Sequence, residues 1–262
     1  MTTTTNTTPA PMSDEDMTRL FKKFHIATAG ARALDIIADP GSDSWTFRDI
    51  LVEMLRAQEA GYQQRISAQR LKAAKLADPN ATLDKITAQP DNGLTAQRLA
   101  RLRDEEWIHG PSPSNLIIVG PTGSGKSFLA QAIAHNACMN LFKVRYWRLA
   151  ELAMSIDGVH HDSAATEKLV KTCADVHLLV LDDFFTTEIS HHASRILFEI
   201  LEARTGQATV IVSQLGAQDW LKMIPNQVTA ESLVNRILHP SMTVALHGHA
   251  NLREVHNPKE AI

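Results

Sequence analysis

The sequence predicts an α/β fold, in which a parallel sheet is covered by helices on both faces and a smaller all-helical domain precedes it. Three observations lead to this prediction. From residue 115 onward, short apolar runs alternate with amphipathic segments, as strands alternate with helices in a parallel sheet. Residues 17 to about 108 instead place apolar side chains at helical spacing. A Pro/Ser loop at 111–114 separates the two patterns, so we expect a domain boundary near residue 110.

The composition is that of an ordinary soluble globular protein. Of 262 residues, 44% are hydrophobic and 21% are charged. The net charge of −3 shows no global basic excess that would indicate nucleic acid, although it allows a local basic patch. The apolar runs fall short of the ~20 residues that a membrane helix needs, so we expect no membrane association and a cytoplasmic location. Two cysteines cannot form a disulfide framework.

Both ends of the chain are predicted to be tails. Residues 1–16 are rich in Thr and have neither the basic nor the apolar region of a secretory signal, so we expect a disordered tail there. Residues 256–262 are expected to form a C-terminal tail. Between the tails we expect a helical domain at 17–110 and a second domain at 111–255.

The helical domain begins with apolar residues at helical spacing over 17–38, which end at a Pro/Gly/Ser loop. Thr46 can cap the next helix, with Asp49 three residues later as a variant of the capping box. This helix is predicted to run to about Leu76. Its expected buried face consists of Phe47, Ile50, Leu51, Met54 and Leu55.

The second domain is predicted to hold five short strands and the helices that connect them. The expected strands are 115–120, 142–148, 177–183, 208–214 and 242–246. The expected helices are 126–139, 193–204 and 231–238. Only 16 residues follow the last of these strands, which is too few for a helical lid over a ligand site.

The stretch "GPTGSGKS" at 120–127 matches the phosphate-binding pattern GxxxxGK[ST], after a buried strand and at the start of a helix. Backbone N–H groups of such a loop wrap phosphates, and the helix N-terminus adds its positive end. Lys126 is expected to reach the β- and γ-phosphates of ATP, and Ser127 to ligate Mg²⁺. The predicted nucleotide-binding residues are Gly120, Pro121, Thr122, Gly123, Ser124, Gly125, Lys126, Ser127 and Phe128.

Two carboxylates end the strand "HLLVLDD", at the sheet edge where ligands of open α/β sheets bind. Asp182 is predicted to hold the Mg²⁺ shell, and Asp183 to orient and polarise an attacking water. Two solvated acids at the start of a loop would be the alternative. Downstream of a phosphate-binding loop, the pair favours hydrolysis over transfer to a small substrate.

Two further side chains are candidates for catalysis. Gln214, which follows Ser213 at a strand end, can hold the water between the γ-phosphate and Asp183. The alternative is a strand that simply ends in polar residues. Arg236 stands on an otherwise apolar helical stretch. It can pair with a local acid, or it can project into a neighbouring subunit's ATP and stabilise transition-state charge.

Several further residues and one longer run fit the pattern of a known protein family. The helical region carries "EAGYQQRISAQRLKAAK" at 59–75. Other matching residues are Trp107, Ile108, Ser213, Gln214, Trp220, Asn235 and Arg236. Together with the P-loop and the paired carboxylates, they resemble the AAA+ ATPases. More specifically, residues 17–255 resemble the IstB/DnaC group of transposition helper ATPases and helicase loaders, with the IstB side closer.

The resemblance implies an AAA+ ATPase domain at 111–255. It implies a protein that assembles with itself on duplex DNA in the ATP state and assists a cognate transposase in target selection. Hydrolysis is expected to be weak before assembly or stimulation. The sequence departs from the group in three places: Asp183 replaces the usual Glu, Asn235 replaces Asp, and only Gly248 and Arg253 remain of a C-terminal motif. Arg253 can partly replace the arginine of the missing lid.

The expected DNA contacts lie in the helical domain. Arg65, Arg70, Lys72 and Lys75 fall in a stretch from 61 to 77 that contains no acid, so they can form a stripe that contacts phosphates. A solvated helix face and a protein-docking face are the alternatives. Three other functions stay open: a DnaC-like helicase loader on single-stranded DNA, a P-loop kinase of a small substrate, and a nucleotide-gated scaffold.

Overall fold

The computed structural model describes residues 11–224, 226–239 and 241–248. The chain forms two compact units, which divide between Ile66 and Ser67. This division lies inside helix α3 (Phe47–Ala74) and not near residue 110, where the sequence predicts a boundary.

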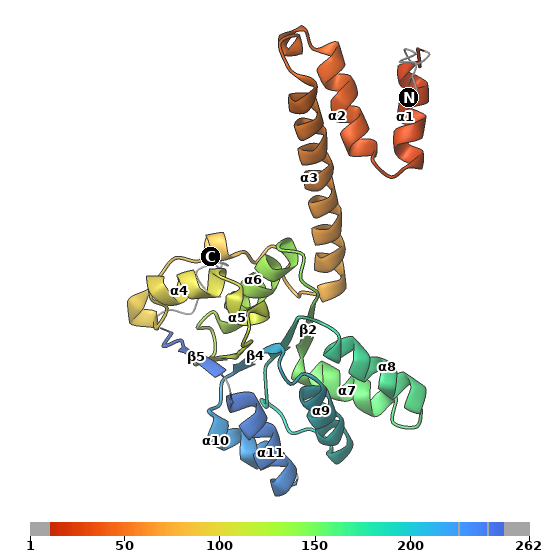
Figure 1. Ribbon diagram of the computed structural model, residues 1–262. Coiled ribbons are helices and arrows are strands. Elements are labelled where there is room, and N and C mark those ends of the chain that lie inside the picture. Colours follow the sequence, from red (N-terminus) through yellow and green to blue (C-terminus); the bar gives the residue numbers. More distant parts are fainter. Residues whose placement is uncertain (1–10, 225, 240, 249–262) are drawn as a thin grey trace, which may run out of the picture. The chain divides into compact units, whose positions relative to one another are not determined.

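The first unit consists of helices α1 (Asp14–Lys23) and α2 (Ala27–Ala38), the short 3₁₀ helix η1 (Pro40–Ser42), and α3 as far as Ile66 (Figure 1). The apolar pattern at 17–38 is therefore two helices, because His25 adopts a left-handed φ of 60° between them. Helix α1 begins at Asp14, so residues 14–16 of the expected N-terminal tail are helical, and Ser13 caps the helix by accepting a hydrogen bond from the Asp16 amide. Residues 1–10 of that expected tail lie outside the described residues.

The N-terminus of α3 confirms the predicted cap. Asp49 Oδ2 accepts hydrogen bonds from the Thr46 amide at 2.9 Å and from the Thr46 hydroxyl at 2.6 Å. The predicted buried face is wrong, since Phe47 is 80% exposed and Leu55 is 60% exposed. Helix α2 packs against another part of α3: the Ala29 amide donates to Gln58 Oε1 at 3.2 Å.

The second unit is built on a five-stranded parallel sheet in the order β2-β3-β4-β1-β5. The strands are β1 (Asn115–Val119), β2 (Val144–Arg148), β3 (Leu178–Asp182), β4 (Ala208–Ser213) and β5 (Ser241–Ala245). All five predicted strands are present. Strands β1 and β3 do not lie side by side, because β4 separates them. Their carboxyl ends nevertheless share one edge of the sheet.

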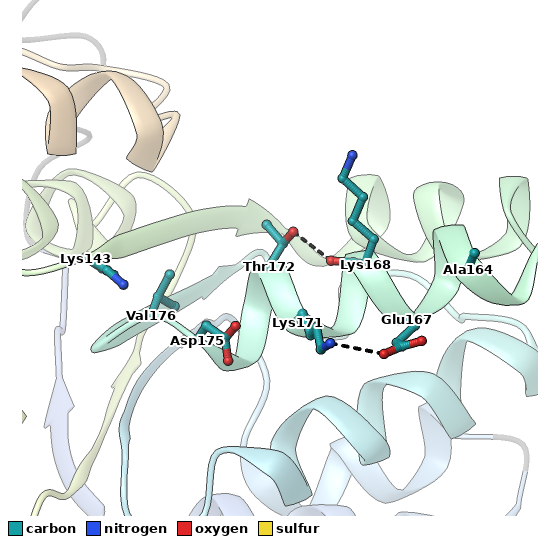
Figure 2. Close-up of a pocket in the computed structure, with 8 residues that line it drawn as sticks. All are labelled: Lys143, Ala164, Glu167, Lys168, Lys171, Thr172, Asp175 and Val176. Carbon is teal, nitrogen blue, oxygen red and sulfur yellow. Dashed lines mark hydrogen bonds and ion pairs between the residues drawn. The ribbon is translucent and has the colours of Figure 1, made fainter.

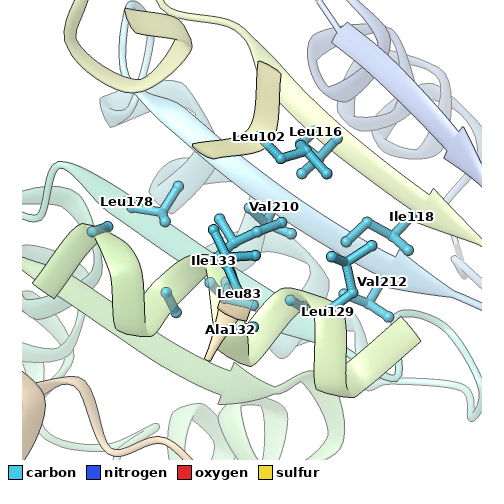
Figure 3. Close-up of a cluster of buried hydrophobic side chains, with 14 of the residues drawn as sticks. Leu83, Leu102, Leu116, Ile118, Leu129, Ala132, Ile133, Leu178, Val210 and Val212 are labelled. Carbon is cyan, nitrogen blue, oxygen red and sulfur yellow. The ribbon is translucent and has the colours of Figure 1, made fainter. Parts of the chain in front are cut away.

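Helices cover both faces of the sheet, as predicted (Figure 1). One face packs against α6 (Lys126–Met139), with Ile133 beside Val210, and Figure 3 shows this cluster. The other face packs against α7 (Leu149–Gly158), α9 (His191–Ala203) and α11 (Gln227–Leu238). Two further helices border this layer, α8 (Ser163–Ala174) and α10 (Ala217–Trp220), with the 3₁₀ helix η4 (Leu221–Met223). The pattern of apolar residues had not predicted α7 or α8.

Residues 67–110 belong to the second unit because their apolar side chains complete the core beside α6. This segment contains the 3₁₀ helices η2 (Leu83–Lys85) and η3 (Pro90–Asn92) and the helices α4 (Ala96–Arg103) and α5 (Glu106–His109). The side chains that it buries there include Leu83, Leu94, Leu99, Leu102, Trp107 and Ile108. Asn136 of α6 also donates to Glu105 Oε1 at 2.9 Å. The hydrophobic core on this face of the sheet is therefore incomplete without this segment.

After β5, the Leu246 amide donates to the Val119 carbonyl at 2.7 Å, and the described chain ends at Gly248. The expected C-terminal tail and Arg253 lie outside the described residues. Among the residues that are described, no helix is both long and apolar enough to cross a membrane.

Candidate nucleotide-binding site

The loop between β1 and α6 has a backbone that only glycine adopts easily. Gly123 and Gly125 have φ values of 79° and 87°, in the left-handed region. A Cβ atom at Gly120 would collide with the Leu246 carbonyl oxygen. This glycine therefore lets the residue after β1 approach the residue after β5 closely. Within the described residues, no side chain caps the α6 N-terminus at Gly125. The first amides of α6 are therefore available to an anion.

Two polar side chains of this loop are nearly buried. Lys126 is 7% exposed, and its Nζ donates to the Pro121 carbonyl at 2.6 Å, so the lysine folds over its own loop. Ser124 is 2% exposed, and its Oγ lacks a hydrogen-bond partner in the described part of the chain. Buried hydroxyl groups normally have a partner. This orphaned hydroxyl therefore fits a ligand that supplies acceptor oxygens, such as a triphosphate.

The hydroxyl of Ser127 and the carboxylate of Asp182 meet at the carboxyl edge of the sheet. Ser127 Oγ donates to Asp182 Oδ1 at 3.2 Å, and the Asp183 amide donates to the same oxygen at 2.8 Å. Asp182 is 1% exposed. Magnesium prefers hard oxygen ligands of this kind, usually one or two from the protein together with water and substrate phosphates. The two predicted metal residues therefore lie close enough to hold one Mg²⁺.

Asp183 directly follows β3 with a φ of 52°, in the left-handed region where non-glycine residues are uncommon. Its side chain is 45% exposed, and Oδ2 lies 4.0 Å from Nε of Arg148. The backbone turn directs this carboxylate away from the buried position of Asp182. A hydrolytic water from solvent can therefore reach it.

The two polar residues at the end of β4 have different roles. Ser213 is 1% exposed, donates to the Phe184 carbonyl at 2.8 Å, and accepts from Trp220 Nε1 at 3.0 Å. It therefore fixes the loop structure. Gln214 is exposed, and its Oε1 accepts from the Thr122 hydroxyl at 2.8 Å. The predicted catalytic amide thus lies directly at the phosphate-binding loop.

Arg236 lies at the opposite end of the sheet. Asn115, the first residue of β1, donates to the Arg236 and Ile237 carbonyls at 3.4 and 3.0 Å. The phosphate-binding loop follows the other end of β1, and five strand residues at 3.3 Å each span about 16 Å. The Arg236 guanidinium donates to Thr205 Oγ1 at 2.9 Å and lies 3.4 Å from Glu202. It is therefore not part of its own chain's nucleotide site.

A hollow of about 510 Å³ adjoins Arg236. Asn235 and Arg204 also line it. Arg204 is 2% exposed and donates to the Cys173 and Val176 carbonyls, both at 2.9 Å. Burial lowers the pKa of Arg204 to about 10. Since its donors meet backbone oxygens, this arginine holds α8, β3 and β4 together.

A second hollow, of about 490 Å³, lies on the outer face of α8 (Figure 2). All its lining residues fall between Lys143 and Val176. Lys171 pairs there with Glu167 at 3.1 Å, and Asp175 adds a second carboxylate. The mixed charge does not fit a nucleotide, so the site at the β1–α6 loop remains the candidate.

The predicted DNA contacts fall in both units. Arg65 belongs to the first unit and lies over the Tyr62 ring at 5.8 Å. Lys72 and Lys75 belong to the second unit and are exposed. Arg70 is half-buried in the second unit, and its Nε has no partner among the residues described. A common DNA-binding stripe therefore stays a prediction.

Two histidines that are far apart in sequence, His160 and His192, meet in the fold. The His160 ring lies 4.7 Å from the His161 ring and 4.1 Å from the His192 ring. In the described ranges, however, no group of three or more His, Cys, Asp or Glu residues is arranged to hold a metal ion. Cys138 and Cys173 are buried, and burial raises the pKa of their thiols to about 12 and about 11.

Two residues of β2 at this site escaped the sequence reasoning. The Tyr146 hydroxyl donates to Asp182 Oδ2 at 2.5 Å, and Arg148 lies beside Asp183. The signal that could have found them is the end of the strand "FKVRYWR". In a parallel sheet, polar residues there share the edge that carries the two carboxylates.

The chain matches known proteins over most of its length. The family described as IstB-like ATP binding protein matches residues 22–258. An insertion sequence ATP-binding protein of Sinorhizobium fredii is 31% identical over 215 residues, which cover 82% of this chain and 86% of the relative. A Mycobacterium tuberculosis ATP-binding protein in an insertion sequence is 28% identical over 203 residues, covering 75% of this chain and 78% of the relative.

Solved structures agree with the fold. The DnaI structure superposes with a TM-score of 0.55 at 19% identity, covering 66% of this chain and 91% of that one. The DnaC helicase loader superposes with a TM-score of 0.53 at 20% identity, covering 64% of this chain and 97% of that one. At such identities the likeness concerns the fold alone.

Proposed function

This chain belongs to the IstB-like ATP-binding protein family, and from that premise we propose that it hydrolyses ATP to assist DNA transposition. In this proposal it assembles with itself on duplex DNA and helps a transposase to select its target. The observation that supports hydrolysis most directly is the meeting of Ser127, Asp182 and Asp183 beside the phosphate-binding loop.

Each side chain then has one task. Lys126 exchanges the Pro121 carbonyl for the β- and γ-phosphates. Ser127 and Asp182 hold Mg²⁺, which neutralises charge on the phosphates when it is bound. Asp183 accepts a proton from the attacking water, and Gln214 holds this water near the γ-phosphate. Thr122 keeps the Gln214 amide at the loop.

Apart from Arg148, which lies between Asp183 and Glu151, the described residues named at this site include no cation outside the loop that could stabilise transition-state charge. Arg236 cannot supply it to its own site, because it lies at the far end of β1. A second copy of the chain can present its Arg236 to the first copy's nucleotide, as arginine fingers do in other NTPases. We therefore propose that hydrolysis needs two neighbouring chains.

Mixing two inactive variants tests this proposal. Asp183→Asn removes the carboxylate that accepts the water proton but leaves the phosphate-binding loop intact for assembly, and Arg236→Ala removes the finger. Each variant alone should hydrolyse ATP poorly, but their mixture should regain activity, since one interface in the mixed assembly has both residues. Arg195→Ala, which removes an exposed arginine paired with Glu199, is the matched control and should behave as wild type. A mixture that stays inactive would argue against sharing of the site.

The DNA and transposase parts rest on the insertion sequence relatives. Their test combines duplex or single-stranded DNA with ATP, ADP or no nucleotide, and measures assembly size and phosphate release. Assembly on duplex that depends on ATP supports the transposition function. A strict preference for single strands would favour a helicase loader, whose fold this chain shares.

The remaining alternatives give distinct results in the same assay. A P-loop kinase would ignore DNA and transfer phosphate to a small metabolite. A nucleotide-gated scaffold would assemble on DNA with ATP but release almost no phosphate. Replacing the predicted DNA contacts Arg65, Arg70, Lys72 and Lys75 by Gln should weaken DNA binding and reduce its salt dependence.

A further inference from the structure

Strand β2 forms one edge of the sheet and supplies a hydroxyl to the metal-binding carboxylate. Tyr146 is 5% exposed, and its hydroxyl donates to Asp182 Oδ2 at 2.5 Å. Ser127 and the Asp183 amide donate to the other oxygen, Oδ1. Donors on both oxygens therefore determine how the Asp182 carboxylate is rotated.

The direction of the tyrosine hydrogen bond follows from its neighbour Arg148. A side-chain hydrogen bond also joins Arg148 to the Tyr146 oxygen. An arginine can only donate, so the tyrosine oxygen accepts from Arg148 and its single proton is left for Asp182. Successive hydrogen bonds of this kind strengthen one another.

Arg148 is itself held between carboxylates. Its Nε lies 4.0 Å from Asp183 Oδ2, and its Nη1 lies 3.9 Å from Glu151 Oε1. The Tyr146 hydroxyl is the donor in its 2.5 Å hydrogen bond with Asp182 Oδ2. The hydrogen bonds thus run in one direction, from Arg148 through Tyr146 to Asp182.

We propose that Tyr146 is a positioning residue for the divalent cation: it keeps Asp182 Oδ1 turned towards Ser127, and Arg148 keeps the tyrosine proton directed at Asp182. The inference rests on the proposed Mg²⁺-dependent ATPase. It assigns to β2 a part in metal binding that is separate from phosphate binding. Loss of the hydroxyl should therefore weaken the metal without weakening the nucleotide.

The test replaces only the hydroxyl, with Tyr146→Phe. Mn²⁺ is titrated into the full chain with a non-hydrolysable ATP analogue, and bound metal is measured by electron paramagnetic resonance. We expect metal affinity to fall roughly 10-fold, as for other groups that orient metal-ligating side chains. The affinity for the analogue in EDTA should stay within about 2-fold of wild type, because the phosphate-binding loop is unchanged.

Three further variants make the result interpretable. The other tyrosine of the chain is Tyr62, and Tyr62→Phe is the matched control that should leave metal affinity unchanged. Arg148→Gln should weaken the metal less than Tyr146→Phe, since the hydroxyl remains. Asp182→Asn should abolish metal binding. It also separates the two proposals: if wild type and Asp182→Asn bind Mn²⁺ equally, the proposed ATPase site fails.

The inference fails alone if wild type binds Mn²⁺ through Asp182 while Tyr146→Phe binds it as tightly. It also fails if Tyr146→Phe weakens the analogue equally with and without metal, because that result indicates a general structural role. Should Tyr146→Phe not fold, Arg148→Gln decides the matter: a loss of metal affinity with unchanged binding in EDTA supports the inference, and unchanged metal affinity overturns it.

Discussion

The two units of this chain differ in how completely they bury their apolar residues. The central strands of the second unit are well buried, and β3 and β4 are buried along their full lengths. In the first unit, the buried residues of α2 are Ala29, Gly30, Ala33 and Ile36. Several large side chains of α3 stay exposed, among them Phe47, Leu51 and Leu55. An apolar pattern thus shows that a helix has an apolar face, but not what covers that face.

The largest expected effect comes from disabling the chemistry of the second unit alone. Lys126→Ala should lower ATP turnover by roughly 100-fold or more, because it removes a charge that acts on the transferred phosphate. It should also abolish ATP-dependent assembly. Phosphate release and light scattering measure the two effects. Hydrogen exchange in α1 to α3 should not change, and a change there would show that the units are coupled.

Truncating one leucine in each unit sharpens the comparison of packing. Leu129 of α6 is 2% exposed, so Leu129→Ala should destabilise the second unit by about 2–5 kcal/mol. Leu55 of α3 is 60% exposed, and Leu55→Ala should cost less than about 0.5 kcal/mol. Urea unfolding followed by regional hydrogen exchange measures both. An equal loss at Leu55 would mean that this face is covered in solution.

Two arginines, one in each unit, allow the same comparison between a buried and an exposed charged side chain. Arg204→Met should cost the second unit about 3 kcal/mol, because it leaves buried carbonyls of Cys173 and Val176 without donors. Arg56→Met in the first unit removes an exposed pair with Glu53 and should cost about 0.5 kcal/mol. Thermal unfolding checks the order, and a reversed order would contradict the description of both sites.

The smallest expected effect is at the cap of α3. The side-chain hydrogen bond from Thr46 holds the pKa of Asp49 below its usual value, and the backbone hydrogen bond adds to this. A carboxyl with a lowered folded pKa stabilises above the unfolded value of about 3.9 and loses this contribution as the pH falls through the folded value. Fraying at the start of α3 should therefore increase in acid.

Hydrogen exchange at the first turn of α3, measured between pH 5 and 3, tests this. Asp49→Asn should remove the pH dependence there, whereas the second unit should respond identically in both proteins. If the first turn of α3 frays equally in wild type and Asp49→Asn as the pH falls, the cap does not contribute in this way.

Much of the second unit could be predicted because its signals are local. The five strands are short buried runs, and the loop at 120–127 has a fixed spacing beside them. The capping residues Thr46 and Asp49 lie three residues apart, so one turn of helix is enough to bring them together. The helical spacing at 17–38 was also local, but it did not reveal the turn at His25.

The sequence by itself determined that this chain has a phosphate-binding loop followed by two carboxylates, since these features depend on neighbours along the chain. Only the tertiary structure decided that residues 67–110 complete the core of the second unit, that Tyr146 meets Asp182, and that Arg236 lies away from its own nucleotide site. These contacts join residues tens of positions apart. They follow from the order of the strands in the sheet, which local spacing does not encode.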